Sequence, residues 1–157
     1  MEKSKRIRLK DALFCAVMGE QIFFLEESMA VGFKVKFYWY QIGHSDFLHS
    51  FFSTVAYNLE NGKWGSHFPM IMNKLYQGKL EKEDIDIAVE ELNIIKNELQ
   101  KISPEKIVWD IEDLSKQPPW QNNISKDITD LSNYFVTSDG NDFITVFFHI
   151  IPVYKSP

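Results

Sequence analysis

The sequence predicts an α+β fold, with a small mixed or antiparallel sheet packed against three to four helices in a single domain. Two kinds of apolar spacing support this prediction: residues alternate with a period of two after position 31, and they recur at three- and four-residue steps in later segments. A chain of 157 residues that is 45% hydrophobic and 25% charged is also large and apolar enough to fold around one core.

The first strand is expected over residues 31–40, where apolar side chains alternate with lysine and tyrosine as on a sheet with one buried face. Gly43 interrupts this pattern. Ser45 then suits the N-cap of a helix whose apolar positions continue at helical spacing until Asn61 and Gly62 provide a stop. We expect this helix to turn its apolar stripe toward the core.

Two more helices are expected in the middle of the chain. One covers residues 69–76, because Pro69 fits a first helical turn and Gly78 fits a stop. The clearer one covers residues 82–102, where the apolar residues share one face and acidic residues lie at the positive end of the helix dipole. Pro104 prevents this helix from continuing.

Apolar and polar residues alternate again over residues 107–111, and residues 134–137 are a shorter candidate of the same kind. These two segments are expected to be further strands, separated by an irregular polar loop on the surface. The last segment is ambiguous. Its apolar residues from Phe143 onward have helical spacing, whereas the β-branched residues among them suit a strand. Pro152 is expected to end the element in either case.

Residues 1–28 are expected to form an N-terminal extension that is not part of the native domain, which then covers residues 29–157. The basic start and short apolar run of this extension resemble a secretory signal only superficially, because acids flank the run and no small-residue cleavage site follows. The run is also too short to span a membrane. One codon choice for residues 25–27 contains a ribosome-binding sequence, so translation could begin at Met29.

Charge and cysteine content restrict the expected partners and location. The net charge of −5 argues against direct binding of nucleic acid, which draws on clustered basic residues, and favours a basic protein partner. Cys15 is the only cysteine, so neither an intramolecular disulfide nor a cysteine-based zinc site can form. A reducing cytoplasm is therefore the expected location.

Motifs for cofactors, metals and nucleophilic catalysis are missing from the sequence. The four histidines have no pair at the four-residue spacing of a helical metal site, and each is expected to be a cap or a surface group. No G-x-S-x-G elbow positions a serine nucleophile, and no glycine-rich loop suits a phosphate. We therefore expect neither a cofactor nor a resident metal.

The most pointed group of residues is an acidic segment that contains tryptophan. In a strand over residues 107–111, Asp110 and Glu112 would project from the same side, roughly 6.6 Å apart along the backbone. Three interpretations stay open: a solvated acidic edge, an edge that binds a protein partner, and a metal-assisted hydrolase that uses Asp110 and Glu112.

The charge distribution favours the partner-binding interpretation. Residues 110–142 contain seven acids and two lysines, an excess of five negative charges that equals the imbalance of the whole chain. Such a patch can steer a basic protein, and tryptophans can anchor it. We expect charge reversal at Asp110 and Asp113 to weaken binding and to leave thermal stability nearly unchanged. The expected partner-binding residues are Trp109, Asp110, Glu112, Asp113, Trp120, Asp127 and Asp130.

Four blocks of the sequence are unusual in composition and order. They are residues 47–54 (FLHSFFST), 64–69 with 72–76 (WGSHFP and MNKLY), 108–116 with 118–120 (VWDIEDLSK and PPW), and 128–140 (ITDLSNYFVTSDG). In order and spacing these blocks resemble the Immunity protein 70 family of bacterial polymorphic toxin systems, over most of the chain from Met29 to about Phe148.

This resemblance implies a cytoplasmic protein that binds and neutralises the toxic C-terminal domain of a cognate toxin, and it supplies no catalytic residues. A basic nuclease is a reasonable candidate for that toxin. The pattern does not include the residues before Met29. The chain also lacks the longer charged tail of the family's last helix, which suggests an atypical or truncated C-terminus.

The leading hypothesis is therefore an immunity protein without catalytic activity, acting through its acidic, tryptophan-containing surface. The alternatives are the metal-assisted hydrolase described above and a protein-interaction module from an unrelated assembly, which the aromatic loops alone would also fit.

Overall fold

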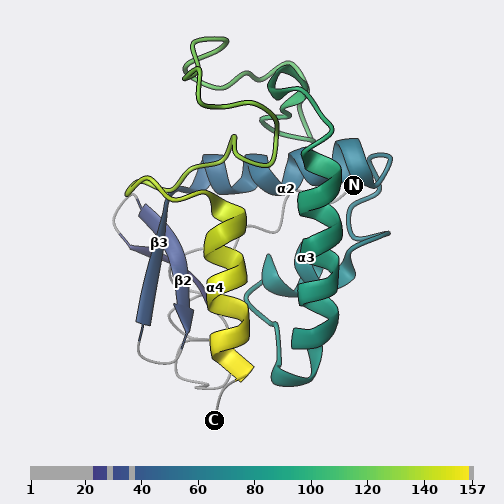
Figure 1. Cartoon of the computed structure of the whole chain (residues 1–157), viewed down its shortest axis with the longest axis vertical. Helices are drawn as coiled ribbons and strands as arrows, with labels where there is room; N and C mark the ends of the chain where they lie inside the picture. The colour runs from purple at the N-terminus through teal and green to yellow at the C-terminus, as the bar shows by residue number, and fades with distance from the viewer. Residues whose placement is uncertain (1–22, 28–29, 36–37, 156–157) are drawn as a thin grey trace.

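The computed structural model describes residues 23–27, 30–35 and 38–155 (Figure 1). Three strands come first: β1 (Phe23–Glu27), β2 (Ala30–Val35) and β3 (Tyr38–His44). They form an antiparallel sheet in the order β1-β2-β3, whose register shifts between Val31 and Gly32. The helical elements follow, and they are α2 (Ser45–Leu59), η1 (Met70–Leu75), η2 (Lys82–Asp84), α3 (Ile85–Leu99), η3 (Pro104–Lys106) and α4 (Phe143–Lys155).

The predicted fold class, α+β with a sheet packed against three to four helices, is wrong for the body of the protein. From Ser45 onward the regular elements of the described chain are all helical, and no strand occurs there, although isolated bridge positions do, such as the pair Val136 and Asp142. Residues 107–111 and 134–137 are not strands, so the sheet expected from them does not exist. Within the part of the chain that the structure describes, the strands lie between residues 23 and 44, where β2 and β3 divide the single strand expected over residues 31–40.

The helix expected after Ser45 is confirmed as α2. Nine consecutive residues, 48–56, are buried, so the helix is covered on all sides rather than along one stripe. The chain leaves α2 as predicted: Asn61 and Gly62 have left-handed φ angles of 53° and 78°, and the Gly62 N–H donates to the Ala56 carbonyl over 2.8 Å.

The two predicted middle helices are present. The shorter one is η1, which is wound as a π-helix and starts after Pro69. The longer one is α3, which follows the single turn η2 and a capping box formed by Glu81 and Asp84. Its predicted apolar face is buried in the core, at Ile85, Ala88, Leu92, Ile95 and Leu99.

The ambiguous last segment is the helix α4. Asp142 precedes it and accepts hydrogen bonds from the Thr145 N–H (2.9 Å) and hydroxyl (2.8 Å), which satisfies the first turn. The prediction that Pro152 ends this element is wrong, because α4 continues to Lys155. Proline removes one N–H donor but its fixed φ fits a helix, so packing can carry the helix past it.

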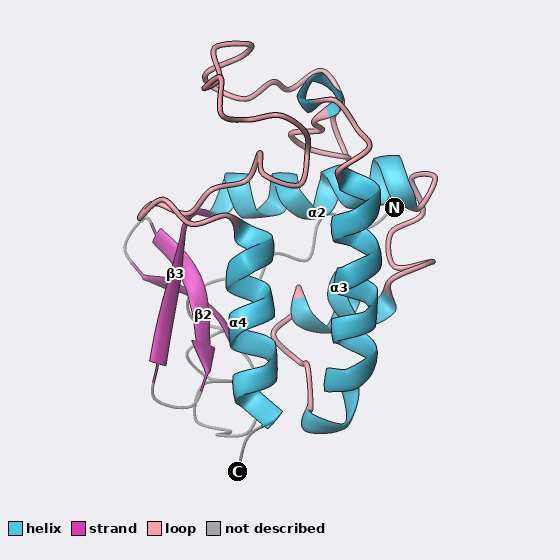
Figure 2. Ribbon diagram, viewed as in Figure 1, coloured by secondary structure: helices cyan, strands magenta, loops and turns pink. Residues whose placement is uncertain are grey.

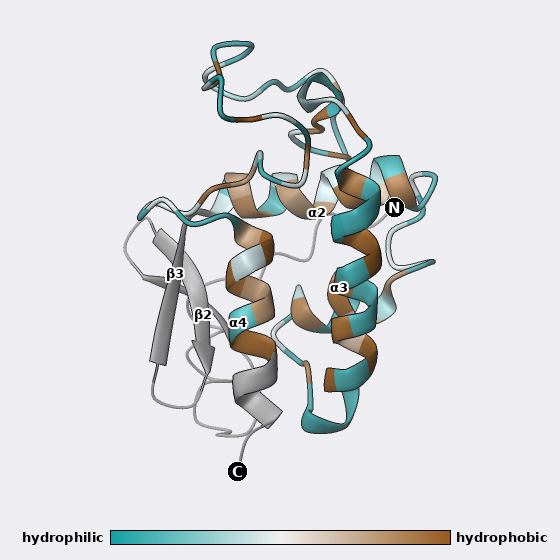
Figure 3. Ribbon diagram, in the orientation of Figure 1, coloured by the Kyte–Doolittle hydropathy of each residue, from teal (hydrophilic) through white to brown (hydrophobic). Residues whose placement is uncertain are grey.

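The helices meet in one core. Figure 2 shows α3 and α4 side by side, α2 crossing near their ends, and the irregular chain after α3 lying beyond α2. Figure 3 shows the coloured part of α4 as mostly apolar and α3 with alternating polar and apolar sides. Phenylalanines fill the junction: Phe51 contacts Phe147 with ring centroids 5.5 Å apart and Phe135 at 5.3 Å.

Among the described residues, no helix combines the length and the apolar character needed to cross a lipid bilayer. The expected N-terminal extension lies outside the described residues as far as position 22. Its residues 23–27 form β1, which pairs with β2.

Candidate functional site

The acidic segment after η3 is fixed to α2 through its backbone. The hydroxyls of Ser50 (2.8 Å) and Thr54 (3.1 Å) donate to the Val108 carbonyl, and Thr54 also accepts the Val108 N–H over 3.0 Å. Ser53 accepts the Ile111 N–H over 3.2 Å. These side chains satisfy the backbone groups that a neighbouring strand would otherwise have to satisfy, which is why this segment is not a strand.

Asp110 lies at the centre of the site and is only 8% exposed. Its Oδ1 lies 3.3 Å from His49 Nε2 and accepts the Glu112 N–H over 3.0 Å, while its Oδ2 accepts from Lys116 Nζ over 3.3 Å. On the other side of the imidazole, His49 Nδ1 lies 3.0 Å from the Tyr76 hydroxyl. The segment is therefore also fixed by a carboxylate that points inward.

The electrostatic surroundings keep Asp110 ionised. Burial by itself would raise the pKa of this carboxyl, but the Glu112 N–H, His49 and Lys116 outweigh burial and lower the pKa below its usual value. The negative charge of Asp110 is thus present at neutral pH, although the side chain is nearly enclosed.

The prediction that Asp110 and Glu112 project from one side of a strand is wrong. Asp110 is buried, Glu112 is exposed, and the Glu112 N–H caps the Asp110 carboxylate. No cluster of three or more histidine, cysteine, aspartate or glutamate side chains arranged to hold a metal occurs within the described residues. The geometry on which the hydrolase alternative rested is therefore not present.

The two tryptophans of the predicted surface are partly covered by an aromatic cluster. Trp109 and Trp120 meet edge to face with centroids 5.6 Å apart, and both contact Phe47, at 6.2 and 5.1 Å. The Trp120 indole N–H donates to the Tyr134 hydroxyl over 2.8 Å. Both tryptophans are half-buried, so only part of each ring can meet a partner.

Glu112 and Asp113 form the exposed acidic part of the site. The Asp113 carboxylate accepts the Ser115 N–H over 3.1 Å and the Ser115 hydroxyl, and these hydrogen bonds lower the pKa of Asp113. Glu112 makes no side-chain hydrogen bond to any described residue. The structure thus brings five predicted residues together, and they are Trp109, Asp110, Glu112, Asp113 and Trp120.

Asp127 and Asp130 belong to a separate turn further along the loop. The Asn133 amide donates to the Asp127 carbonyl over 3.0 Å, and Asp130 accepts the Ser132 N–H over 2.8 Å. These contacts shape the turn itself. No hydrogen bond between described residues connects either carboxylate with Asp110 or Asp113.

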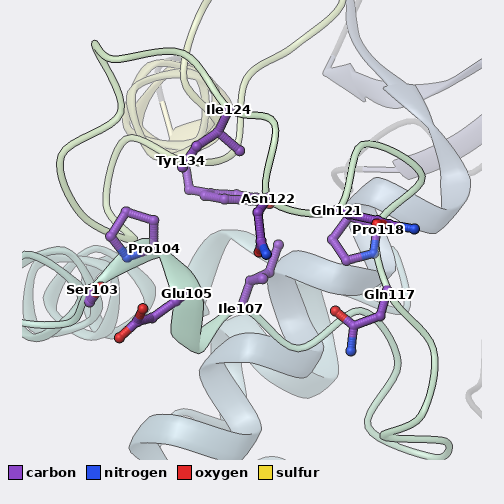
Figure 4. Close-up of a pocket in the computed structure, with 10 residues that line it drawn as sticks. All are labelled: Ser103, Pro104, Glu105, Ile107, Gln117, Pro118, Gln121, Asn122, Ile124 and Tyr134. Atoms are coloured by element: carbon purple, nitrogen blue, oxygen red, sulfur yellow. The ribbon is translucent and has the colours of Figure 1, made fainter.

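Two recesses lie beside the segment that carries Trp120. The first, about 250 Å³ in volume, adjoins the buried carboxylate and is lined by Asp46, His49, Trp109, Asp110 and Lys116. The second, about 280 Å³ in volume, lies between η3 and the following loop (Figure 4). Its lining is mostly uncharged and consists of Ser103, Pro104, Glu105, Ile107, Gln117, Pro118, Gln121, Asn122, Ile124 and Tyr134.

Two buried glutamates, which no pattern in the sequence indicated, shape the loop before η1. Glu60 is fully buried at the end of α2 and accepts the N–H groups of Gly65 (3.0 Å), His67 (2.9 Å) and Phe68 (3.0 Å). Glu91 on α3 accepts the Ile71 N–H over 2.9 Å, close to the start of η1. Burial raises the pKa of Glu91, although backbone N–H donors oppose the shift.

The expectation that each histidine is a cap or a surface group is wrong for His49, which is only 2% exposed. His67 and His149 are exposed, and the side chain of His44 lies outside the described residues. One signal could have located His49. Small polar residues recur beside it on α2 at helical spacing, at positions 50, 53 and 54, which indicates a second buried side.

The described body is thus a helical scaffold that fixes an irregular, partly acidic loop by its backbone, an arrangement that suits a binding protein. The chain belongs to the Immunity protein 70 family, whose model matches residues 33–156 and confirms the resemblance seen in the sequence. Neither the curated proteins nor the solved structures contain a match to this chain. Family membership implies an immunity protein of a toxin system and favours a role without catalysis.

Proposed function

We propose that this immunity protein binds the toxic C-terminal domain of a cognate bacterial toxin and neutralises it through the acidic surface around Trp109 and Trp120. The observation that carries the proposal is the attachment of this loop to α2. Its backbone is held by buried hydroxyls while Glu112 and Asp113 stay exposed. A surface fixed before binding loses little conformational entropy when a partner docks.

The charge of this surface sets the kind of partner. Glu112 and Asp113 can steer a positively charged domain toward the loop, and close charge pairs at such interfaces can be coupled by about 1.5–7 kcal/mol. A nuclease domain fits this description, because it needs basic residues to hold phosphates. By covering those residues, the immunity protein would block the toxin in the cytoplasm without any chemistry of its own.

The remaining predicted residues have graded roles in this proposal. The exposed edges of Trp109 and Trp120 serve as anchors near the centre of the interface, because partly buried aromatic rings are already ordered. Asp127 and Asp130 lie on the next turn and form a rim, where single exposed charges contribute about 1 kcal/mol or less. Asp110 supports the loop from below.

Co-expression with the toxin domain encoded by the neighbouring gene tests this function. We expect the intact chain to rescue growth and to co-purify with the toxin domain. Absence of any association, or turnover of a substrate by the purified chain alone, would contradict the proposal.

The surface is tested by a charge-reversed variant, Glu112→Lys with Asp113→Lys, which should raise the Kd for the toxin domain on the order of tenfold or more. The matched control is Glu83→Lys with Glu90→Lys, which reverses two exposed acids on η2 and α3 and changes the net charge equally. Equal loss in both variants would show that only overall charge matters, and no loss in either would place the interface elsewhere.

A further inference from the structure

We infer that the recess between Asp46 and Trp109 accepts one arginine side chain of the toxin, whose guanidinium binds the Asp110 carboxylate in place of Lys116. The inference rests on the proposed function and names the chemistry that this site recognises. It makes Asp110 a buried receptor for a single cation, in addition to its role in supporting the loop.

The recess has the size and lining that such a side chain needs. Its volume of about 250 Å³ exceeds that of a guanidinium group, and two of its five lining residues are carboxylates. The indole of Trp109 provides a wall, and a guanidinium can stack on an aromatic ring. The other recess lacks this combination, since Glu105 is its one carboxylate and prolines and amides form much of its wall.

The two oxygens of Asp110 have different surroundings. Oδ1 is engaged by His49 Nε2 and by the Glu112 N–H, whereas among the described residues Oδ2 has one hydrogen-bond partner, Lys116 Nζ. An ionised carboxylate oxygen accepts about two hydrogen bonds. Oδ2 therefore keeps the capacity for a cationic donor, while the other oxygen holds the carboxylate in position.

Lys116 is suited to be displaced. Its side chain is 55% exposed, and its nitrogen lies 3.3 Å from Oδ2, longer than the roughly 2.7–2.9 Å of a strong charge-assisted hydrogen bond. The lysine side of this pair lies in solvent, where side-chain freedom and screening weaken an ion pair. Lys116 thus marks the place where a cation binds, without holding that place firmly.

Arginine fits this place better than lysine does. Its planar guanidinium presents several donors in fixed directions, is more weakly hydrated than an ammonium group, and can bind a carboxylate while stacking on a ring. A second lysine would only repeat the contact that Lys116 already makes. The site should therefore distinguish the two cations.

Titration calorimetry of the full chain with the toxin domain tests the exchange. We expect Lys116→Met to lower the Kd about twofold to fivefold, because the competing ammonium is gone. Lys126→Met is the matched control, since it removes an exposed lysine from the same irregular loop and changes the net charge equally. An unchanged or higher Kd for Lys116→Met, or an equal gain in the control, would overturn the inference.

Asp110→Asn removes the charge but keeps the shape of the side chain, and we expect it to raise the Kd about tenfold or more. In the Asp110→Asn background the gain from Lys116→Met should disappear. A folded Asp110→Asn variant that binds the toxin normally would overturn the inference. If the variant does not fold, the comparison of Lys116→Met with Lys126→Met decides instead.

A double-mutant cycle identifies the arginine. Each arginine of the toxin domain is changed to lysine in turn, and one of these changes should be non-additive with Asp110→Asn but additive with Asp113→Asn. Absence of any such arginine would contradict the inference. Failure of the unaltered chain to bind the toxin would instead contradict the proposed function, so the two failures are distinguishable.

Discussion

Buried carboxylates fix two loops of this chain, but the hydrogen-bond donors that they bind differ. In the loop before η1, Glu60 binds three backbone N–H groups, which cannot leave without unfolding the loop. In the acidic segment, Asp110 binds His49 and an exposed lysine, together with one N–H. A carboxylate whose donors are all backbone N–H groups supports the structure of its loop, whereas a carboxylate bound partly by a movable side chain can exchange that donor for a partner's cation.

The largest effect should come from breaking the first kind of contact. Glu60→Ala leaves three N–H groups without their acceptor, and we expect it to lower the free energy of unfolding by about 3–5 kcal/mol. Denaturant unfolding measures this loss. Glu90→Ala, an exposed glutamate on α3, should stay within about 0.5 kcal/mol of the unaltered chain. Similar values for the two variants would refute the structural role of Glu60.

The attachment of the acidic segment to α2 should be the next most sensitive feature. Thr54→Val keeps the shape of a fully buried side chain but removes both hydrogen bonds to Val108, at an expected cost of about 1–3 kcal/mol. Ser50→Ala should cost less, because the Val108 carbonyl keeps the Thr54 hydroxyl as a donor. Thermal unfolding of both variants checks this order, and a larger loss for Ser50→Ala would contradict it.

Alanine substitutions at two glycines in the loop before η1 can distinguish the cost of backbone strain from the cost of steric crowding. Gly62 and Gly65 have similar φ angles of 78° and 79°, so alanine should cost each about 1–2 kcal/mol. A Cβ at Gly62 meets nothing within 4 Å, whereas one at Gly65 would meet the Asn73 amide. Gly65→Ala should therefore be the more destabilising by roughly 1 kcal/mol. Asn73→Ala in the Gly65→Ala background should recover the difference, and no recovery would argue against this contact.

The smallest expected effect is an opposite pH dependence at two of the buried carboxylates. Burial raises the pKa of Glu91 above 4.5, so its contribution to stability is complete below pH 4.5 and is lost as pH rises through the folded-state pKa. The pKa of Asp110 is lowered below 3.8, so its contribution is present above pH 3.8 and is lost as pH falls through the folded-state pKa.

Thermal unfolding of Glu91→Gln and Asp110→Asn between pH 3 and 7 tests these signs. Relative to the unaltered chain, Glu91→Gln should remove a loss of stability above pH 4.5, and Asp110→Asn should reduce the loss at the acidic end. Profiles that change in the same direction for both variants would contradict the assignment.

The sequence predicted the helices because their apolar residues repeat locally, and Ser45, Gly62 and Gly78 supplied helix or turn boundaries. It failed at residues 107–111, where alternation indicated a strand. Alternation reports which side chains are buried but not which groups satisfy the backbone, and here the donors and acceptors are hydroxyls that lie more than fifty residues earlier in the chain.

The same limit explains which features of the candidate site the sequence predicted and which it did not. The sequence brought Trp109, Glu112 and Asp113 into one hypothesis because they are neighbours in the chain. It treated Asp110 as an equally exposed member, since nothing local reveals that His49, sixty-one residues away, binds it. The expectation that charge reversal at Asp110 would leave thermal stability unchanged therefore no longer holds, whereas Asp113, which is exposed, remains suited to that experiment.

Apart from the inward-pointing carboxylate of Asp110, the contacts that attach the acidic segment to α2 are hydrogen bonds from helix hydroxyls to main-chain atoms, so they do not depend on the other side chains of the segment. Substitutions at outward-facing loop positions can accumulate without loosening this attachment, because no anchoring hydrogen bond passes through them. When a toxin changes, its immunity protein could thus adapt by substitutions at these surface positions while the contacts that fix the loop stay the same.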